Sequence, residues 1–363
     1  MTATPWPMPE PPDREHIADA SDARSSDADL PAAPGVTAAA VPGRLLMVDD
    51  RGVFVRGPHR PPVAPDREQD GTDMPVALYV HGLAGNSTNF DVVGAVLAQQ
   101  CRSYAIDLPG FGRSDPPPGE RYGLEDDAAV VAAVIRELSP GRRVHLVGNS
   151  LGGLVCVLLA ARHPELVASL SLISPAVPDL RMTTDRGADP RLALLLAPGT
   201  TAPAVRRLAG IDALQRAAGM AALCYGDPGR LSDADIGAAA VELGWRFPLR
   251  WVHTSTIRSV RSLMRSYLHW GGTSFRSLAG TVAVPVLVIW GTRDRLVDCG
   301  LAPATAAAFP NGRLLVLRDC GHVAQMERPE PTARAMLALW EDADAAAGAS
   351  RLRGVPGVAP STA

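Results

Sequence analysis

The sequence contains no lysine, only five cysteines and few aromatic residues, which make up 5% of its 363 positions. All 35 of its Lys or Arg positions are therefore arginine, and 38 acidic residues bring the net charge to -3. No basic block stands out, so neither nucleic acid nor a strongly basic membrane-surface helix is expected. The cysteines are odd in number and have no CxxC spacing, which argues against a disulfide framework or a zinc site.

Long hydrophobic runs are also absent. No uninterrupted apolar run reaches the ~20 residues that a helix needs to cross a bilayer. Residues 1–35 have neither the positive region nor the apolar region of a secretory signal. We therefore expect a cytoplasmic protein without a transmembrane segment. Hydrophobic residues make up 47% of the chain, which is enough for a sizeable core.

The two ends of the chain differ in composition from the part between them. Residues 1–38 are rich in Pro, Ala, Asp and Ser, which predicts a flexible segment, and residues 346–363 predict a flexible tail. Residues 43–57 read as a β-hairpin around Asp50-Arg51-Gly52.

Short β-type runs then alternate with helical runs. Strands are predicted at 74–80, 103–107, 143–148, 168–174, 284–291 and 313–319, and helices at 90–100, 124–138, 151–163, 301–309 and 331–344. This alternation predicts an α/β protein with a mostly parallel sheet and helices on both faces.

One long interval breaks the alternation. Helical periodicity dominates residues 177–280, for example in RLALLLA (191–197) and in the run from Ala204 to Tyr225. We therefore predict a helical insertion at 177–280, within a core formed by 39–176 and 281–345.

The stretch VHLVGNSLGGLVC contains one serine, Ser150, among three glycines. If the first part is a strand and the last part a helix, Ser150 lies on the sharp turn between them, and GNSLG matches the G-x-S-x-G pattern of a nucleophile elbow. Amides at the helix start favour developing negative charge there. The alternative is an ordinary serine N-cap beside packing glycines.

Two residues further along the chain make the nucleophile interpretation stronger. Asp294 and His322 each follow a predicted strand, where open α/β sheets place their sites. A serine hydroxyl needs a base, and the base needs a carboxylate that orients it. The chain order Ser150, Asp294, His322 is that of one hydrolase architecture, in which the oxyanion donors are the amide after the nucleophile, here Leu151, and one from an earlier loop, here Leu83.

Taken together, these motifs resemble the α/β-hydrolase superfamily, specifically its capped single-chain members. The resemblance implies an eight-stranded, mostly parallel sheet, and a cap at about 177–280 that roofs the site and selects the substrate. It implies Ser150 as nucleophile, His322 as general base and acid, Asp294 as orienting acid, and no cofactor or metal. The matching motifs cover roughly residues 43 to 343: HGLAG (81–85), DLPGFGRSD (107–115), GNSLGG (148–153), GTRD (291–294) and GHVAQMERP (321–329).

Several other polar residues are weaker candidates. Asp298 and Asp179 are rival positions for the catalytic acid. Asp107 and Asp115 are read as turn residues. His81 is read as a brace for the oxyanion loop and His145 as a core histidine.

Aromatic residues concentrate in the second half of the insertion. Trp245, Trp251, Tyr267 and Trp270 are tentative pocket residues for a hydrophobic substrate. His253 and His269 also lie there, but without carboxylates at metal-ligand spacing.

The favoured reaction is hydrolysis of a small hydrophobic carboxylic ester through an acyl-enzyme. A serine at the elbow argues against epoxide and halide chemistry, for which related folds use a carboxylate. The runner-up is a C–C bond hydrolase of ring-cleavage diketones, whose polar contacts would fall at Asn86 and Asn89. Val323 argues against it, because those enzymes commonly have an aromatic residue directly after the histidine. A non-catalytic, ligand-binding member is the third possibility.

Overall fold

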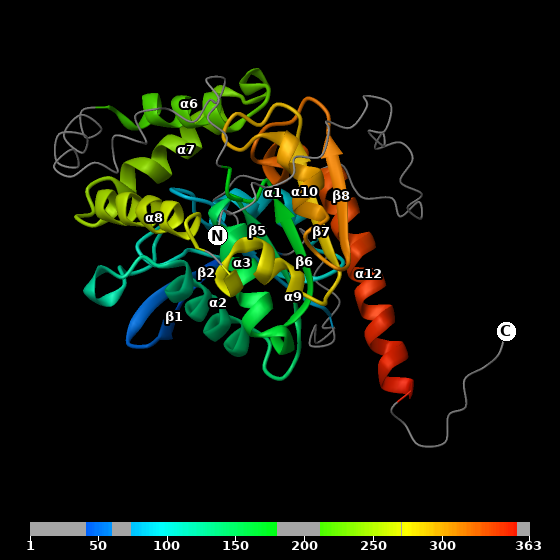
Figure 1. Cartoon of the computed structure of the whole chain (residues 1–363). Helices are drawn as coiled ribbons and strands as arrows, with labels where there is room; N and C mark the ends of the chain where they lie inside the picture. The colour runs from blue at the N-terminus through cyan, green and yellow to red at the C-terminus, as the bar shows by residue number, and fades with distance from the viewer. Residues whose placement is uncertain (1–40, 60–73, 180–210, 270, 354–363) are drawn as a thin grey trace, which may run out of the picture.

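The protein is built on one eight-stranded sheet. The computed structural model describes residues 41–59, 74–179, 211–269 and 271–353 (Figure 1). The strands run in the order β1-β2-β4-β3-β5-β6-β7-β8, and all pairs from β4 to β8 are parallel, while β1, β2 and β4 pair in antiparallel fashion. This confirms the predicted fold class. The strands are β1 Gly43–Val48, β2 Arg51–His59, β3 Val76–Val80, β4 Arg102–Ile106, β5 Val144–Asn149, β6 Val167–Ile173, β7 Val286–Gly291 and β8 Gly312–Leu317.

The first two strands form the predicted hairpin, but its turn lies one residue earlier than the sequence suggested. Val48 pairs with Arg51, so Asp49 and Asp50 form the turn, with φ angles of 48° and 60°. A two-residue hairpin loop of type I′ needs positive φ at both positions, and aspartate tolerates that conformation better than most residues.

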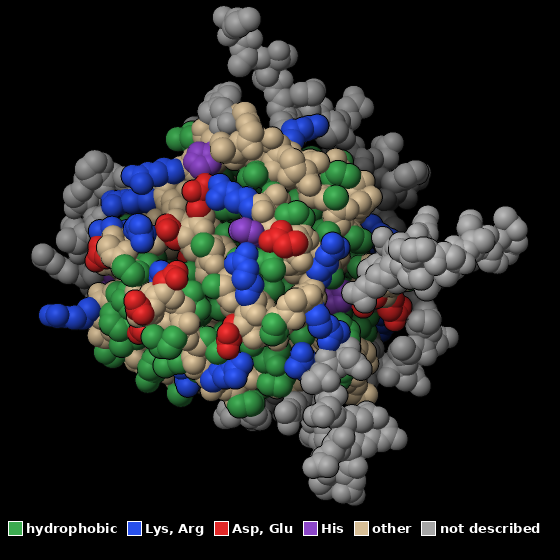
Figure 2. Space-filling model, turned by 90° about the horizontal axis from the view of Figure 1, so that it is seen from below, with side chains coloured by type: hydrophobic (Ala, Val, Ile, Leu, Met, Phe, Trp, Pro, Cys, Tyr) green, Lys and Arg blue, Asp and Glu red, His purple; other side chains and the backbone are tan. Residues whose placement is uncertain are grey.

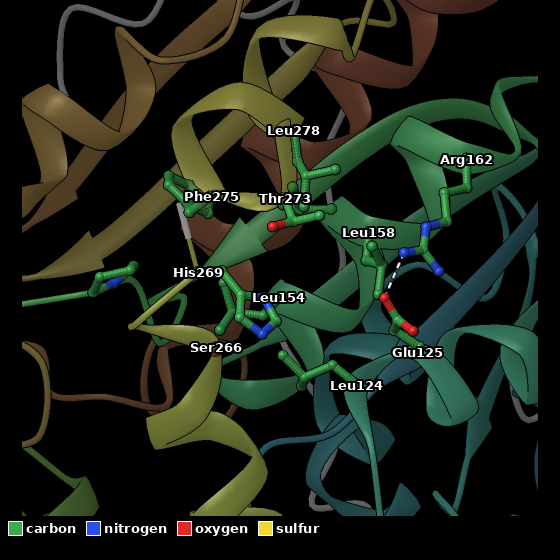
Figure 3. Close-up of a pocket in the computed structure, with 12 residues that line it drawn as sticks. Leu124, Glu125, Leu154, Leu158, Arg162, Ser266, His269, Thr273, Phe275 and Leu278 are labelled. Atoms are coloured by element: carbon green, nitrogen blue, oxygen red, sulfur yellow. Dashed lines mark hydrogen bonds and ion pairs between the residues drawn. The ribbon is translucent and has the colours of Figure 1, made fainter. Parts of the chain in front are cut away.

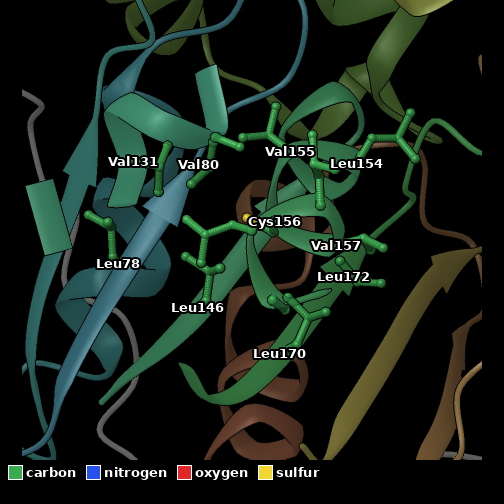
Figure 4. Close-up of a cluster of buried hydrophobic side chains, with 14 of the residues drawn as sticks. Leu78, Val80, Val131, Leu146, Leu154, Val155, Cys156, Val157, Leu170 and Leu172 are labelled. Atoms are coloured by element: carbon green, nitrogen blue, oxygen red, sulfur yellow. The ribbon is translucent and has the colours of Figure 1, made fainter. Parts of the chain in front are cut away.

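Helices cover both faces of the sheet. The buried side chains of α2, α3, α9 and α10 pack on one face, and those of α1, α11 and α12 on the other. Figure 4 shows the first layer, where Leu146 of the sheet lies beside Cys156 of α3, and Leu78 lies on the side of Val131 of α2. These helices are α1 Asp91–Val96, α2 Leu124–Leu138, α3 Leu151–Arg162, α9 Phe275–Thr281, α10 Ala302–Ala306, α11 Ala324–Glu327 and α12 Pro329–Arg353.

A group of helices lies between β6 and β7 in the sequence. Helices α6 (Ala213–Cys224), α7 (Asp233–Arg246) and α8 (Val252–Ser266) lie at one end of the sheet in Figure 1. We call the described residues from 211 to 269 the cap, and α9, which follows, packs on the sheet. Part of the predicted insertion falls outside the described residues, namely the helical run at 191–197 and the first part of the run from Ala204 to Tyr225, up to residue 210. The predicted flexible segment at 1–38 and Trp270 also lie outside the described residues.

The last helix is longer than predicted. Helix α12 continues to Arg353, whereas the sequence suggested an end at Asp344 and a flexible tail from Ala346. The run from 343 to 349 is mostly alanine, the residue with the best intrinsic helix propensity, so the helix continues through it.

The described surface is mixed in charge. On the face seen in Figure 2, arginine and acidic side chains are interspersed among apolar ones. None of the helices in the described part of the chain combines the length and the apolar character required to cross a bilayer.

Candidate active site

Ser150 lies on the turn that joins β5 to α3. Its φ is 54° and its ψ is -118°, a backbone conformation that residues other than glycine rarely adopt. Holding a residue there costs about 1–3 kcal/mol, which the surrounding structure must supply. The Ser150 N–H donates to the carbonyl oxygen of Ile173 at 3.0 Å, and the residue is partly exposed. The sharp turn therefore presents the hydroxyl at the carboxyl end of the sheet.

The glycines around Ser150 allow this turn to form. A Cβ on Gly148 would lie 2.5 Å from the carbonyl oxygen of Gly152. A Cβ on Gly152 would collide with the carbonyl oxygens of Val80 and His81. The glycines are needed because strand, helix and the neighbouring loop approach one another at backbone distance.

His322 and Asp294 form a buried hydrogen-bonded pair. His322 Nδ1 donates to Asp294 Oδ2 at 2.9 Å, and the Asp294 side chain is 0% exposed. The other oxygen, Oδ1, accepts from the N–H groups of Leu296 and Val297 at 2.9 and 3.0 Å. Burial alone would raise the pKa of the Asp294 carboxyl, but the His322 imidazole and the two amides together lower it. The aspartate is therefore ionised and fixed in orientation.

Asp298, the rival acid, lies elsewhere. It is exposed, and its Oδ1 accepts from the N–H of Gly300 at 2.7 Å, where it caps a short 3-10 helix at Cys299–Leu301. The structure thus brings Asp294, and not Asp298, to His322.

Asn149 connects the serine turn to the histidine loop. Its Nδ2 donates to the carbonyl oxygens of Ile173 and of His322, both at 3.0 Å. The residue before Ser150 therefore holds the backbone of His322. Sequence reasoning missed this role; its position inside the GNSLG motif was the available signal.

The loop after β3 lies against the serine turn. A Cβ on Gly82 would be 3.0 Å from the Ser150 Cβ, so the backbone of this loop lies directly against the serine turn. Leu83, the expected oxyanion donor, is the next residue of the loop. Leu151 is the first residue of α3, where helix geometry leaves the amide without an intrahelical acceptor.

His81 supports the same loop. Its Nε2 accepts from the N–H of Leu108 at 3.0 Å, which puts the ring proton on Nδ1, and Nδ1 donates to the carbonyl oxygen of Gly82 at 2.7 Å. Burial lowers the pKa of His81 to about 3. A neutral imidazole in one fixed tautomer therefore supports the loop, which is the role expected for His81 from the sequence.

Two aspartates of the DLPGFGRSD segment serve the backbone. Asp107 accepts from the N–H groups of Ser87 and Arg113 at 2.6 and 2.8 Å, and Asp115 accepts from that of Gly52 at 2.8 Å. Burial raises the pKa of Asp107. Both carboxylates fix loops beside the site and have no contact with His322 among the described residues.

Three of the four aromatic residues that were expected in a pocket lie within the described residues, and two of them contact the core. Trp245 is 50% exposed and lies under the guanidinium of Arg113, 5.4 Å from the ring centre. Tyr267 donates its hydroxyl proton to the carbonyl oxygen of Ala176 at 3.0 Å, and Trp251 is the N-cap of α8. Trp270 lies outside the described residues.

The apolar hollow shown in Figure 3 lies apart from the proposed catalytic residues. It is lined by side chains of α3, of the start of α2 and of the segments around α8 and α9. Ser150, Asp294 and His322 do not line it; its wall includes Leu124, Leu154, Leu158, His269, Phe275 and Leu278, with the ion-paired Glu125 and Arg162 at one side.

Two charged residues were missed by sequence reasoning. Arg246, the last residue of α7, is only 4% exposed and donates to the carbonyl oxygen of Gly85 at 3.3 Å. Glu327, in the GHVAQMERP motif, accepts from three backbone amides. A single charged residue in a helical pattern is ordinarily exposed to solvent. The sequence therefore does not distinguish these two buried residues from exposed charged residues.

Among the residues that the structure describes, no group of three or more His, Cys, Asp or Glu side chains is arranged to hold a metal ion.

Comparison with known proteins identifies the family. Residues 75–203 and 252–329 match the family model described as alpha/beta hydrolase fold. An uncharacterized protein of Mycobacterium tuberculosis is 32% identical over 261 residues, or 68% of this chain and 70% of that protein.

Two relatives carry named activities. A 2-hydroxy-6-oxononadienedioate/2-hydroxy-6-oxononatrienedioate hydrolase of Cupriavidus pinatubonensis is 29% identical over 71% of this chain and 83% of its own length. A monoacylglycerol lipase of Mus musculus is 27% identical over 72% of this chain and 74% of its own length. The first is named for a dienedioate and the second for an acylglycerol, so these relatives act on different classes of compound.

Proposed function

Because this chain belongs to the α/β-hydrolase fold family, we propose that it is a serine hydrolase that cleaves hydrophobic carboxylic esters. The observation that carries the proposal is the buried His322–Asp294 pair and its link to the serine turn. The carbonyl oxygen of His322 accepts a hydrogen bond from Asn149, the residue before the strained, partly exposed Ser150. The similarity to a monoacylglycerol lipase supports an ester with an apolar acyl group.

The proposed reaction proceeds in two steps. Ser150 Oγ attacks the ester carbonyl carbon while His322 Nε2 takes the hydroxyl proton. The carbonyl oxygen becomes an oxyanion, which the amides of Leu83 and Leu151 stabilise. His322 then gives the proton to the departing alcohol oxygen, leaving an acyl-enzyme. Water, deprotonated by His322, attacks the acyl carbon, and Ser150 regains its proton as the acid leaves.

Asp294 contributes orientation and charge. Its Oδ1 is held by two backbone amides, so Oδ2 has one position from which to accept the Nδ1 proton of His322. This arrangement leaves Nε2 of His322 free of a proton for the attack and stabilises the imidazolium that follows.

A C–C bond hydrolase is the second candidate, favoured by the relative from Cupriavidus pinatubonensis. Two observations weigh against it. The side-chain oxygens of Asn86 and Asn89 are used in a capping box at Ser87–Phe90, where they accept from the amides of Thr88 and Asn86. The residue directly after the histidine is Val323, whereas such enzymes commonly have an aromatic residue at that position.

The test is a p-nitrophenyl ester series from acetate to long-chain acyl, run with wild type and Ser150→Ala. We expect hydrolysis that peaks at one chain length and disappears in Ser150→Ala. Ser277→Ala, on α9, is the matched control and should retain the wild-type rate. A folded wild-type protein that hydrolyses no ester but cleaves a ring-cleavage diketone would replace the ester proposal with the second candidate.

A further inference from the structure

The cap touches the histidine loop through backbone atoms. The His322 N–H donates to the carbonyl oxygen of Cys224, the last residue of α6, at 2.7 Å. Gly226 and Gly321 face each other: a Cβ on Gly226 would be 2.9 Å from the carbonyl carbon of Cys320, and one on Gly321 would collide with Cys224. At this point the cap has direct contact with the residue proposed as the catalytic base.

The carboxylate of Glu327 joins the two segments. Oε2 accepts from the N–H of Gly321 at 2.7 Å and from that of Gly226 at 3.0 Å, and Oε1 accepts from that of Asp227 at 3.1 Å. Glu327 is 8% exposed. Hydrogen bonds from amides to a buried carboxylate are among the stronger ones in proteins, so the cap segment and the histidine loop are held to one common charged group.

Apolar packing strengthens the same junction. Ala221 and Tyr225 of the cap form a small buried cluster with Val323, the residue after His322. On the opposite side, the His322 carbonyl oxygen accepts from Asn149 Nδ2 at 3.0 Å. The backbone of His322 is therefore fixed by the cap at its N–H and by the serine turn at its carbonyl.

We propose that Glu327 is a positioning residue that couples the placement of the cap to the placement of His322. This proposal rests on the proposed function, because it assigns His322 the role of base. When the Glu327 carboxylate holds Gly226 and Gly321 together, the imidazole is aligned with Ser150. A shift of α6 caused by a substrate under the cap is transmitted to the base through the same three amides. Glu327 itself does not touch the reacting atoms.

The first variant is Glu327→Gln, compared with Glu341→Gln, an exposed glutamate on α12. The amide group of glutamine has only one acceptor oxygen, so at least one of the three N–H donors loses its partner. We expect kcat for the best p-nitrophenyl ester to fall by about 10²-fold, with KM changed by less than about threefold, since a misplaced base affects chemistry more than binding. Glu341→Gln should keep both constants.

Amide hydrogen exchange gives a second readout that does not depend on activity. In Glu327→Gln, the oxygen should stay at the position where Gly226 and Gly321 donate, so only the Asp227 amide should exchange faster. In Glu327→Ala, which removes both acceptor oxygens, the amides of Gly226, Asp227 and Gly321 should exchange faster together, although they belong to two distant segments. Gly226→Ala perturbs the junction from the cap side, and it decides the matter if Glu327→Ala does not fold. It should lower kcat in the same way.

Wild-type kcat in a folded Glu327→Ala protein would overturn the proposal, and so would a loss of kcat in that protein without faster exchange at Gly321. If the wild-type protein hydrolyses no ester, the proposed function fails, but exchange still tests the coupling. Joint acceleration of the three amides in Glu327→Ala would support it, and separate behaviour of the two segments there would refute it.

Discussion

Replacing Asp294 by asparagine should abolish most of the activity through the tautomer of His322. The asparagine side chain keeps one acceptor oxygen and gains two N–H donors. Leu296 and Val297 both donate to Oδ1, so the amide oxygen belongs at that position. The NH2 group then faces His322 Nδ1, which must accept, and the ring proton moves to Nε2.

The magnitude follows from comparing the two orientations of the asparagine. Turning the amide the other way would leave two backbone N–H groups without an acceptor, at about 1 kcal/mol or more each. The orientation that imposes the wrong tautomer is therefore favoured by ~2 kcal/mol or more. An enzyme in which the base holds its proton on the wrong nitrogen loses about 10⁴-fold in kcat, equivalent to ~5.5 kcal/mol of transition-state stabilisation.

The assay is steady-state hydrolysis of the best p-nitrophenyl ester by wild type, Asp294→Asn and Asp298→Asn. Thermal unfolding of each protein verifies that it is folded. Asp298→Asn should remain close to wild type, because Asp298 is exposed and caps a short 3-10 helix. An Asp294→Asn enzyme within about tenfold of wild type would refute the reasoning, since the wrong tautomer would then carry little cost.

Three further predictions concern pH and packing. The value of kcat/KM should fall as the solution is made more acidic, because protonated His322 cannot accept the serine proton; a flat profile would contradict its role. Burial raises the pKa of Asp127 from its ordinary 3.8 to about 8. The folded state thus binds this proton more tightly, and its stability should decline as pH rises from about 4 to 8; Asp127→Asn should flatten that decline in urea unfolding curves measured at several pH values. Gly152→Ala forces a Cβ against the Val80 carbonyl oxygen and should cost about 1–3 kcal/mol in thermal unfolding as well as activity, whereas Gly280→Ala, with open space around it, should cost neither.

The fold was predictable because its signals are local. Helix α2 has the bounds predicted from its periodicity, Leu124–Leu138, and each predicted strand of the sheet forms within two residues of its expected position. The GNSLG turn was also readable, because its glycines stand beside the serine in the chain. Short-range patterns of this kind depend on the backbone and on neighbours a few residues away.

The support of the candidate site was not predictable, because it depends on distant partners. The Asn149 bond to His322 spans 173 residues, and the Glu327 bond to Gly226 spans 101. Trp245 of the cap packs with Arg113 of the core, and helical periodicity does not indicate that contact. Periodicity indicates that a residue lies on a helix, but the direction in which that helix packs is determined by the rest of the molecule.

The insertion of the cap between β6 and β7 has a consequence for how the chain folds. Strands β3 to β6 pair within residues 76–173, so the serine turn can form from comparatively near contacts. The bond between Asn149 and His322 requires a loop of 173 residues to close, and long loops are slow to close because of their entropy. We therefore expect a refolding chain to complete the half of the sheet that bears Ser150 before His322 joins it. The return of the proposed ester hydrolysis should come after the burial of the first core, in the last stage of folding.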